Sequence, residues 1–526
     1  MRRVLVPLLV GLVLIPSAWL AWNSRDAPHL GFFHDDSLFW VSARSLAGGG
    51  GYRIQSLPGE PYQTKYPPLY PLLLAGVWKL NPSFPDNLPQ AVLSSWLTLV
   101  ACLLLARIAF RDLGAGPNGA WALCAVLALS PFYALCGISL LSELLFACLS
   151  LGSLALIERA RAPSRGTGLA VVAGLVGSAA CLTRSIGLVL LAAGPLVFLM
   201  GKQYRRAAVF ALAMLPGTAA WLLWTHAHRL ARPDMVALYY TDYLGYWVRD
   251  GTARNLAVVL WRNLDDLLSS IGGMFVFGLG DSFAGKSLAR VLAVAAIAGT
   301  ARLWQRSGAM AYVLFTAGYM LALLLWNFPP DQRFLVPVFP VLLASFSPEL
   351  QRLVSKLRAA FVDRATGQRV VAGAISLALA ALLSLAGAQA YAGLFSVLPA
   401  FVAQQRAALA EHRTAYRWIA ANTPGDAAML AYLDPILYLY TGRKVCRMVL
   451  SPALIRTGDQ RALEAVFADV ANFARRQKLS YAVLTPEDLQ AELPDQERLA
   501  AYRLFRANPR LRRVFETGSV SVCRIE

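Results

Sequence analysis

Long apolar runs recur along most of the chain, and they constrain its fold more than any other feature. A membrane-crossing helix needs about 20 mostly apolar residues, and about eleven segments approach that length. Because 57% of the 526 residues are hydrophobic and only 15% are charged, the composition indicates an integral membrane protein. The predicted spans are 4–22, 90–110, 118–136, 141–157, 167–183, 186–201, 207–225, 287–303, 308–327, 334–348 and 370–390.

Two shorter apolar pieces, 67–77 and 267–280, are rich in Pro or Gly. We interpret them as helices lying at the membrane interface, although counting both as spans would raise the total to about 13. The sequence thus predicts an all-α polytopic membrane domain over residues 1–395.

Basic residues between the apolar runs predict how the spans are oriented. When eleven spans alternate, the Lys and Arg clusters around 107–111, 159–165, 202–206, 302–306 and 352–369 all fall on one side, which the positive-inside rule assigns to the cytoplasm. The opposite, exoplasmic side receives the long loops 23–66 and 226–286 and the turn 327–333. Because the net charge of +19 arises largely from these flanking clusters, it indicates a membrane surface and not nucleic acid.

The hydropathy falls near residue 400, and the pattern changes to mixed helices and strands. We predict a soluble α/β domain over 396–526 on the exoplasmic side, to which we assign no chemistry. Cys446 and Cys523 lie in this part, and a disulfide between them is one reading of their placement. The expected elements are helices at 412–422 and 459–478 and strands at 427–432 and 479–485.

Two adjacent carboxylates, Asp35 and Asp36, lie in the first predicted exoplasmic loop. Neighbouring carboxylates ionise together only when positive charge is close. One of them could then act as a general base, or the pair, together with Glu143, could hold a divalent metal cation through oxygen ligands. The simpler alternative is an N-cap for a helix over 38–46.

Three further charged residues lie at the ends of predicted spans on the same face. Glu143 begins a span, where a carboxylate is either functional or favoured by the helix dipole. Arg184 separates two apolar runs and Arg333 heads another, so each could bind a phosphate. The alternatives are snorkelling of Arg184 to lipid phosphate and an ion pair between Arg333 and Asp331.

Lys65 precedes Tyr66-Pro67-Pro68, whose rigid backbone would fix the direction of the ammonium group. Cations at the level of the lipid head groups suit a ligand with a phosphate at the interface and an apolar tail in the bilayer. Carboxylates beside them would add a base or a metal site.

The order of these motifs resembles the polytopic GT-C glycosyltransferases, and looks closest to the bacterial protein-mannosyltransferase and lipid A aminoarabinose transferase group (glycosyltransferase family 39-like). The similarity covers roughly residues 1–350 and depends on order and spacing, since each motif is short. The motifs are the acidic pair at 35–36, Lys-Tyr-Pro-Pro-Leu-Tyr at 65–70, Leu-Ser-Glu-Leu-Leu-Phe at 141–146, Leu-Thr-Arg at 182–184 and Arg-Phe-Leu-Val-Pro at 333–337.

This resemblance implies a multi-pass protein of the bacterial inner membrane with an exoplasmic active site. It implies inverting transfer of a hexose or pentose from a polyprenyl-phosphate donor to a lipid, glycan or protein acceptor. The implied roles are catalytic for Asp35, Asp36 and Glu143 and phosphate-binding for Lys65, Arg184 and Arg333.

The chain departs from the aminoarabinose transferases at several of these positions. It has His-Asp-Asp at 34–36 where they tend to have Pro-Asp-Glu, Glu143 where they have Asp, and Arg184 where they have Lys. These departures keep the charges and favour a general bacterial member of the group. The rival interpretation is a transporter of a lipid-linked or anionic substrate, but the charged residues gather at one face and no repeated halves are visible.

Overall fold

A computed structural model describes residues 2–526 apart from 249–252, 281, 307, 327–328, 363–365 and 491. Parts of the predicted loops 226–286 and 327–333 and the end of the predicted span 308–327 therefore lie outside the described residues. The chain divides into two compact units. The first unit comprises residues 1–25, 92–221 and 254–400, and the second comprises 26–91, 222–253 and 401–526.

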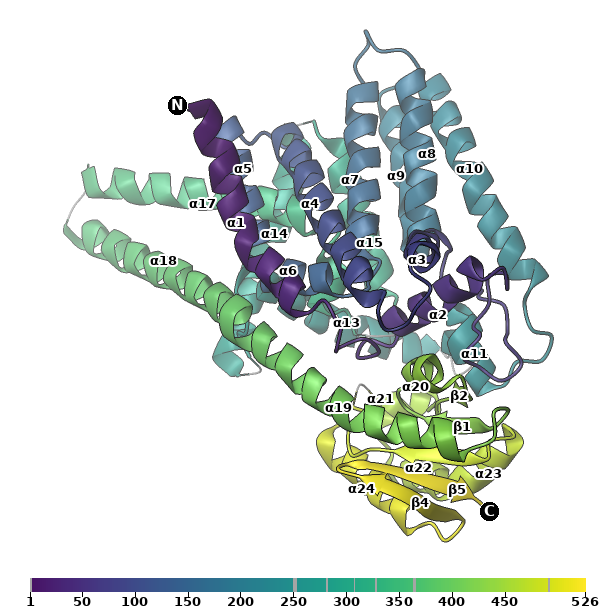
Figure 1. Cartoon of the computed structure of the whole chain (residues 1–526). Coiled ribbons are helices and arrows are strands. Elements are labelled where there is room, and N and C mark those ends of the chain that lie inside the picture. Colours follow the sequence, from purple (N-terminus) through teal and green to yellow (C-terminus); the bar gives the residue numbers. More distant parts are fainter. Residues whose placement is uncertain are drawn as a thin grey trace. The chain divides into compact units, whose positions relative to one another are not determined.

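The first unit is helical throughout its described part (Figure 1). Helices α4, α10 and α13 belong mostly to it and extend by a few residues into the second unit. Its elements are α1 (Arg2–Asn23), α4 (Leu88–Asp112), α5 (Pro117–Ala128), α6 (Pro131–Ile138), α7 (Glu143–Ala160), α8 (Gly168–Thr183), the 3-10 turn η1 (Ser185–Gly187), α9 (Leu188–Met200), α10 (Tyr204–Ala227), α13 (Ala253–Phe275), α14 (Phe283–Arg306), α15 (Met310–Leu324), α16 (Gln332–Leu335), α17 (Phe339–Val362), α18 (Thr366–Ala392) and the π-helical turn η2 (Gly393–Val397).

Each predicted span overlaps one or two of these helices. Among the described residues, four helices are long and apolar enough to cross a membrane: Leu88–Asp112, Tyr204–Ala227, Phe283–Gln305 and Arg369–Asn422. The pair α5 and α6, which is bent by 63° at the break before Pro131, would make a fifth. The chain is thus a multi-pass membrane protein, while the count of about eleven spans stays a prediction, since several of the other apolar helices are only 10–17 residues long.

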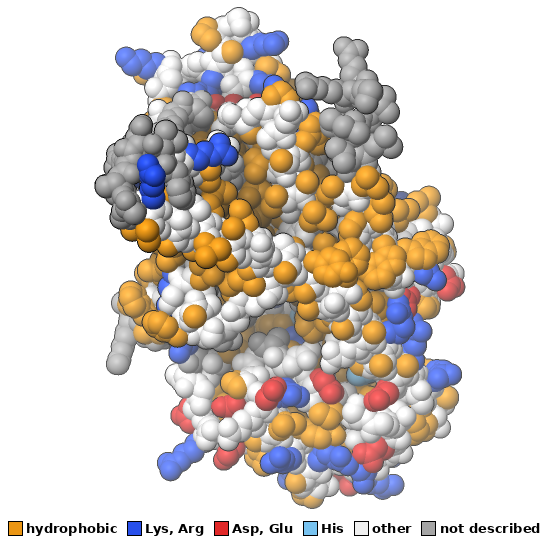
Figure 2. Space-filling model, turned by 90° about the vertical axis from the view of Figure 1, so that its left-hand side faces the viewer, with side chains coloured by type: hydrophobic (Ala, Val, Ile, Leu, Met, Phe, Trp, Pro, Cys, Tyr) orange, Lys and Arg blue, Asp and Glu red, His pale blue; other side chains and the backbone are white. Residues whose placement is uncertain are grey.

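Many large hydrophobic side chains on the helices of the first unit are exposed. Examples on four different helices are Leu97, Leu212, Val291 and Leu377. Figure 2 shows hydrophobic side chains gathered across one face of the molecule. Exposed apolar patches of this kind are unfavourable in water and favourable against lipid tails, so they fit the membrane-protein composition.

The second unit combines helices with a mixed five-stranded sheet. Its helices are α2 (Asp35–Ala47), α3 (Leu69–Leu80), α11 (Met235–Thr241), α12 (Tyr243–Val248), α19 (Leu398–Asn422), α20 (Asp434–Thr441), α21 (Pro452–Thr457), α22 (Gln460–Ala468), α23 (Val470–Arg476) and α24 (Asp495–Ala507). Its strands are β1 (Ala428–Ala431), β2 (Lys444–Cys446), β3 (Tyr481–Leu484), β4 (Leu511–Thr517) and β5 (Val520–Ile525).

The strand order is β2-β1-β3-β5-β4. Strand β1 pairs in parallel with β2 and β3, whereas β5 is antiparallel to both β3 and β4. The strands predicted at 427–432 and 479–485 are β1 and β3, and the helices predicted at 459–478 are α22 and α23.

The sequence left open whether Cys446 and Cys523 form a disulfide, and in the structure both thiols are free and buried. Cys446 lies on β2 and Cys523 on β5, with β1 and β3 between them. Three strand spacings of about 4.8 Å separate the two backbones by about 14 Å. A disulfide requires Cα atoms within about 7 Å, so the sheet order excludes the bond.

Segments far apart in the sequence pack together inside the second unit. The backbone N–H of Val445 donates to the carbonyl of Ser56 at 2.8 Å, and the Tyr246 hydroxyl donates to the carbonyl of Leu450 at 2.7 Å. Gly31 has a φ of +96°, and a Cβ there would lie 2.6 Å from the Ile436 side chain of α20. The loop after α1 is therefore part of the same compact unit as the sheet, a grouping that hydropathy alone does not reveal.

Candidate functional site

Asp35 is the first residue of α2 and is held by a tyrosine from the same predicted loop. The Tyr66 hydroxyl donates to Asp35 Oδ1 at 2.5 Å. Burial, and then the negative charge of Asp35, raises the pKa of Tyr66 well above its ordinary value, so the phenol keeps its proton and acts as the donor. This bond orients one carboxylate oxygen of Asp35.

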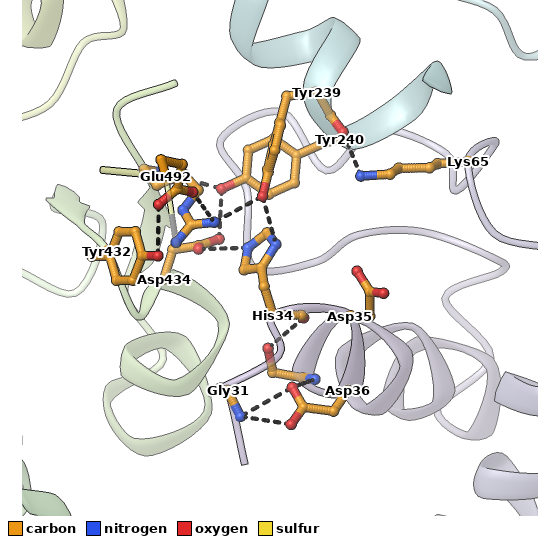
Figure 3. Close-up of polar contacts among 12 residues, drawn as sticks. Gly31, His34, Asp35, Asp36, Lys65, Tyr239, Tyr240, Tyr432, Asp434 and Glu492 are labelled. Atoms are coloured by element: carbon orange, nitrogen blue, oxygen red, sulfur yellow. Dashed lines mark hydrogen bonds and ion pairs between the residues drawn. The ribbon is translucent and has the colours of Figure 1, made fainter. Parts of the chain in front are cut away.

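Asp36 is turned the other way and has a structural role. Its carboxylate accepts hydrogen bonds from the backbone N–H groups of Gly31 at 3.0 and 3.1 Å and of Ser37 at 2.6 Å, and its side chain is fully buried. Figure 3 shows the two neighbouring carboxylates pointing in different directions. The two adjacent carboxylates therefore do not face each other. His34 is the N-cap of α2, which has no side-chain cap bond, and the catalytic role of Asp36 stays a prediction.

Lys65 is buried among three tyrosine rings. Its ammonium nitrogen lies 5.1 Å from the ring centre of Tyr66, 4.6 Å from that of Tyr239 and 4.4 Å from that of Tyr243, and it donates to the carbonyl of Tyr239 at 2.9 Å. Burial lowers the pKa of Lys65 to about 8, with the charge of Asp35 opposing the shift and that of Arg447 adding to it. The ammonium is therefore largely charged at neutral pH and close to its titration range.

His34, immediately before Asp35, takes part in a buried polar network that also includes the C-terminal segment (Figure 3). Its Nε2 lies 3.0 Å from Asp434 Oδ1, and its Nδ1 lies 3.1 Å from the Tyr239 hydroxyl. The Tyr240 hydroxyl donates to Asp434 Oδ2 at 2.8 Å, and Arg447 donates to the Tyr239 hydroxyl at 2.8 Å. We call these five side chains the His34 network.

The network continues to a second ion pair. Arg447 lies 3.5 Å from Glu492 and 3.9 Å above the ring centre of Tyr432, whose hydroxyl donates to Glu492 at 2.7 Å. A buried guanidinium is costly unless it is paired in this way. Apart from His34, which was noted only as part of His-Asp-Asp at 34–36, the sequence did not single out these residues; the tandem tyrosines at 239–240 are a local signal for two of them.

The first unit contains a separate cluster of charges around Glu143, the first residue of α7. Glu143 Oε1 lies 2.9 Å from an Arg184 guanidinium nitrogen and 3.3 Å from Arg333 Nε, and Glu143 is buried. Arg184 also donates to the Ser142 hydroxyl at 3.0 Å. The structure thus brings together three of the predicted site residues, which we call the Glu143 cluster.

The Asp331 carboxylate accepts from the backbone N–H groups of Arg333 at 2.9 Å and Phe334 at 3.4 Å, which caps α16. Burial raises the pKa of Asp331, and the charge of Arg333 opposes that shift. Arg184 and Arg333 both lie near the face of Phe334, at 5.7 and 4.9 Å from its ring centre.

The carboxylates predicted to hold a metal do not fit that role. The carboxylate of Asp36 accepts hydrogen bonds from backbone N–H groups. Glu143 lies between two guanidinium groups and belongs to the other unit. Within the described part of the chain, no group of three or more His, Cys, Asp or Glu side chains is placed to bind a metal ion. We therefore derive no step through a metal.

Neither a protein-family model nor a curated protein matches this sequence. Solved structures do match the fold. ArnT from Cupriavidus metallidurans bound to undecaprenyl phosphate is 15% identical, with a TM-score of 0.57 over 98% of this chain and 97% of that chain. Its apo structure is 14% identical, with a TM-score of 0.53 over 93% of both chains.

A second matching protein comes from an archaeon. The oligosaccharyltransferase AglB from Archaeoglobus fulgidus, in complex with an inhibitory peptide and a dolichol-phosphate, is 14% identical, with a TM-score of 0.54 over 96% of this chain and 74% of that chain. ArnT, an aminoarabinose transferase, and AglB both belong to the GT-C superfamily. The likeness spans nearly the whole chain, so the predicted GT-C fold is confirmed.

Proposed function

We propose that this protein is an integral membrane glycosyltransferase that moves a sugar from a polyprenyl-phosphate donor to an acceptor hydroxyl. The observation that supports it most is the GT-C fold over nearly the whole chain, shared with proteins whose structures contain undecaprenyl phosphate or dolichol-phosphate. The half-buried Asp35 and the buried Tyr66 and Lys65, all in the first predicted exoplasmic loop, supply chemistry suited to that reaction.

In the proposed reaction, the acceptor oxygen attacks the anomeric carbon as the bond from that carbon to the phosphate oxygen breaks. The bonding electrons leave with the polyprenyl phosphate, and Asp35 takes the proton of the acceptor hydroxyl. In-line displacement inverts the configuration at the anomeric carbon. The Tyr66 hydroxyl holds one oxygen of Asp35, which leaves the carboxylate oriented for this transfer.

Lys65 is the proposed cation for the donor phosphate in the second unit. A compact ammonium in a dry site stabilises the negative charge that develops on a leaving phosphate. Arg184 and Arg333 stay proposed phosphate-binding groups, since a guanidinium can bind a phosphate through two parallel hydrogen bonds. Glu143 is then the residue that holds both of them.

The test is transfer by purified protein in lipid nanodiscs, supplied with labelled polyprenyl-phosphate hexoses and pentoses and with lipid, glycan and protein acceptors. We expect one donor class to give a product with inverted anomeric configuration, read by NMR. Flux of the donor across proteoliposomes without any sugar transfer would favour a transporter instead. Labelling of single cysteines near Asp35 from the outside of intact cells tests the proposed exoplasmic side.

A further inference from the structure

The second unit joins the first predicted loop to the C-terminal sheet through buried hydrogen bonds, and these converge on the residue before Asp35. His34 has a φ of +61°, a left-handed conformation that a residue with a side chain adopts only where its surroundings hold it. Its ring lies between Asp434 of α20 on one side and Tyr239 of α11 on the other. The start of α2, and with it Asp35, depends on both contacts.

The contacts of His34 fit a neutral imidazole. The Asp434 carboxylate accepts, so His34 Nε2 carries the hydrogen of that 3.0 Å contact. The Tyr239 hydroxyl accepts from Arg447 and can donate its own hydrogen to His34 Nδ1. The lowered pKa of His34 favours this neutral Nε2–H tautomer, and a second proton on Nδ1 would reverse the contact and take the acceptor away from the Tyr239 hydroxyl hydrogen.

Tyr239 also connects this network to the proposed phosphate-binding lysine. Its hydroxyl bonds His34 and Arg447, while its carbonyl accepts from Lys65 at 2.9 Å and its ring lies beside the ammonium. Arg447 is thus connected to Lys65 through Tyr239, and Asp434 is connected to Asp35 through His34, the residue before it. The described contacts give the C-terminal segment a direct route to the proposed reaction.

We propose that Asp434 and Arg447 are positioning residues for the transfer reaction, acting through His34 and Tyr239 on Asp35 and Lys65. This inference rests on the proposed function. It assigns to the C-terminal α/β segment a share of the active site, beyond any role in holding an acceptor.

The charges around His34 predict a pH signature. Burial and the cation of Arg447 lower the pKa of His34, Asp434 raises it, and Lys65 lowers it; the neutral hydroxyls of Tyr239 and Tyr240 complete its surroundings. The neutral tautomer is present above that lowered pKa and is lost as pH falls through it. Removing Asp434 should move the pH midpoint of His34 protonation to lower pH, and removing Arg447 should move that midpoint to higher pH.

The first experiment needs no activity. Solid-state NMR of full-length protein labelled with ¹⁵N-histidine in lipid bilayers would report the imidazole tautomers of its five histidines, with His34→Gln assigning the signal of interest. We expect a neutral Nε2–H His34 at pH 7. Its midpoint should fall in Asp434→Asn and rise in Arg447→Gln. A different tautomer, or midpoints that do not move, would overturn the inference.

The second experiment measures transfer by the same variants. We expect kcat to fall about 100-fold in Asp434→Asn, the loss typical of a misplaced catalytic group, with a smaller change in KM for the donor. The acid limb of the pH profile should move with the NMR midpoint. His412→Gln is the matched control, because His412 is a buried histidine of α19 that bonds only the carbonyl of Ala408 among its described hydrogen bonds.

Unchanged kcat and an unchanged pH profile in both variants would overturn the inference. If Asp434→Asn does not fold, Tyr240→Phe replaces it. Loss of that hydroxyl donor leaves more of the Asp434 negative charge to interact with His34, so the His34 midpoint should rise. Absence of transfer by the parent protein with every donor would instead refute the proposed function. The NMR experiment would still report the tautomer of His34, because it does not depend on activity.

Discussion

Buried charges are compensated differently in the Glu143 cluster and in the His34 network. In the Glu143 cluster, one carboxylate lies directly against two guanidiniums and forms an ion pair with each. In the His34 network, tyrosine hydroxyls and an imidazole separate Asp434 from Arg447. The first arrangement fixes charges with little directionality, whereas the second fixes hydrogen positions, which is what proton transfer requires.

The largest effects are expected at Asp35 and Asp36, the two acids that directly follow His34. They test whether the His34 network positions a catalytic base. If Asp35 is the base, Asp35→Asn should reduce transfer by about 10³-fold, within the range for general bases, with little change in thermal stability. Asp36→Asn should instead change transfer little and reduce stability. It weakens charged hydrogen bonds to Gly31 and Ser37 and should lower the free energy of unfolding by about 2 kcal/mol.

Both variants would be followed by turnover assays and by thermal unfolding in the same detergent. Equal losses of activity in the two variants, corrected for the folded fraction, would show that both acids take part in catalysis.

The Glu143 cluster should respond to mutation mainly through stability. Glu143→Gln leaves two guanidiniums facing each other without their shared anion, and should cost about 3 kcal/mol, the low end for a broken buried pair because both arginines are partly exposed. Asp265→Asn is the control, since its ion pair with Arg290 is exposed and contributes little. Loss of transfer at full stability would show that Glu143 acts in the chemistry itself.

The tyrosine cage of Lys65 predicts a pH dependence of donor binding. The ammonium is charged below its pKa of about 8 and loses its proton as pH rises through that value. Affinity for undecaprenyl phosphate should therefore fall by up to tenfold per pH unit above about 8. Lys65→Arg should keep its affinity to higher pH, because a guanidinium stays charged.

Titration calorimetry or a fluorescent lipid phosphate between about pH 7 and 10 would measure this effect. The phosphate itself is almost fully ionised above its second pKa of about 6, so it adds little change in that window. An affinity that does not change with pH would show that Lys65 does not bind the phosphate.

The smallest effect is expected from reduction. Because Cys446 and Cys523 are free on separated strands, a reducing agent should leave the melting temperature unchanged, and maleimides should label both thiols only after unfolding. A shift on reduction would mean that a covalent link, and not hydrogen bonding alone, holds the sheet beside the His34 network.

The sequence predicts those features whose signal is local. Apolar runs coincide with helices because hydropathy is averaged over neighbouring residues. Glu143, Arg184 and Arg333 could be picked out as charges at the ends of such runs, and the structure brings them together. Strands β1 and β3 were predictable, whereas β2 has three residues and too short a pattern to recognise.

The His34 network was not predictable, because its partners come from three distant segments. His34 and Asp434 are 400 positions apart, and neither stands in a recognisable motif for the other. The hydrogen bonds of Asp36 were not predictable for a related reason. Its carboxylate is used by the backbone of Gly31, and only the turn before α2 shows that these groups meet.

The second unit is built from residues 26–91, 222–253 and 401–526, and this order has a consequence for biogenesis. A chain made from its N-terminus delivers His34 early and Asp434 late, after the helices of the first unit have been synthesised. Until then Gly31 lacks Ile436 to pack against, and the imidazole lacks its carboxylate. The loop that carries Asp35 can reach its final form only when the last part of the protein has left the ribosome.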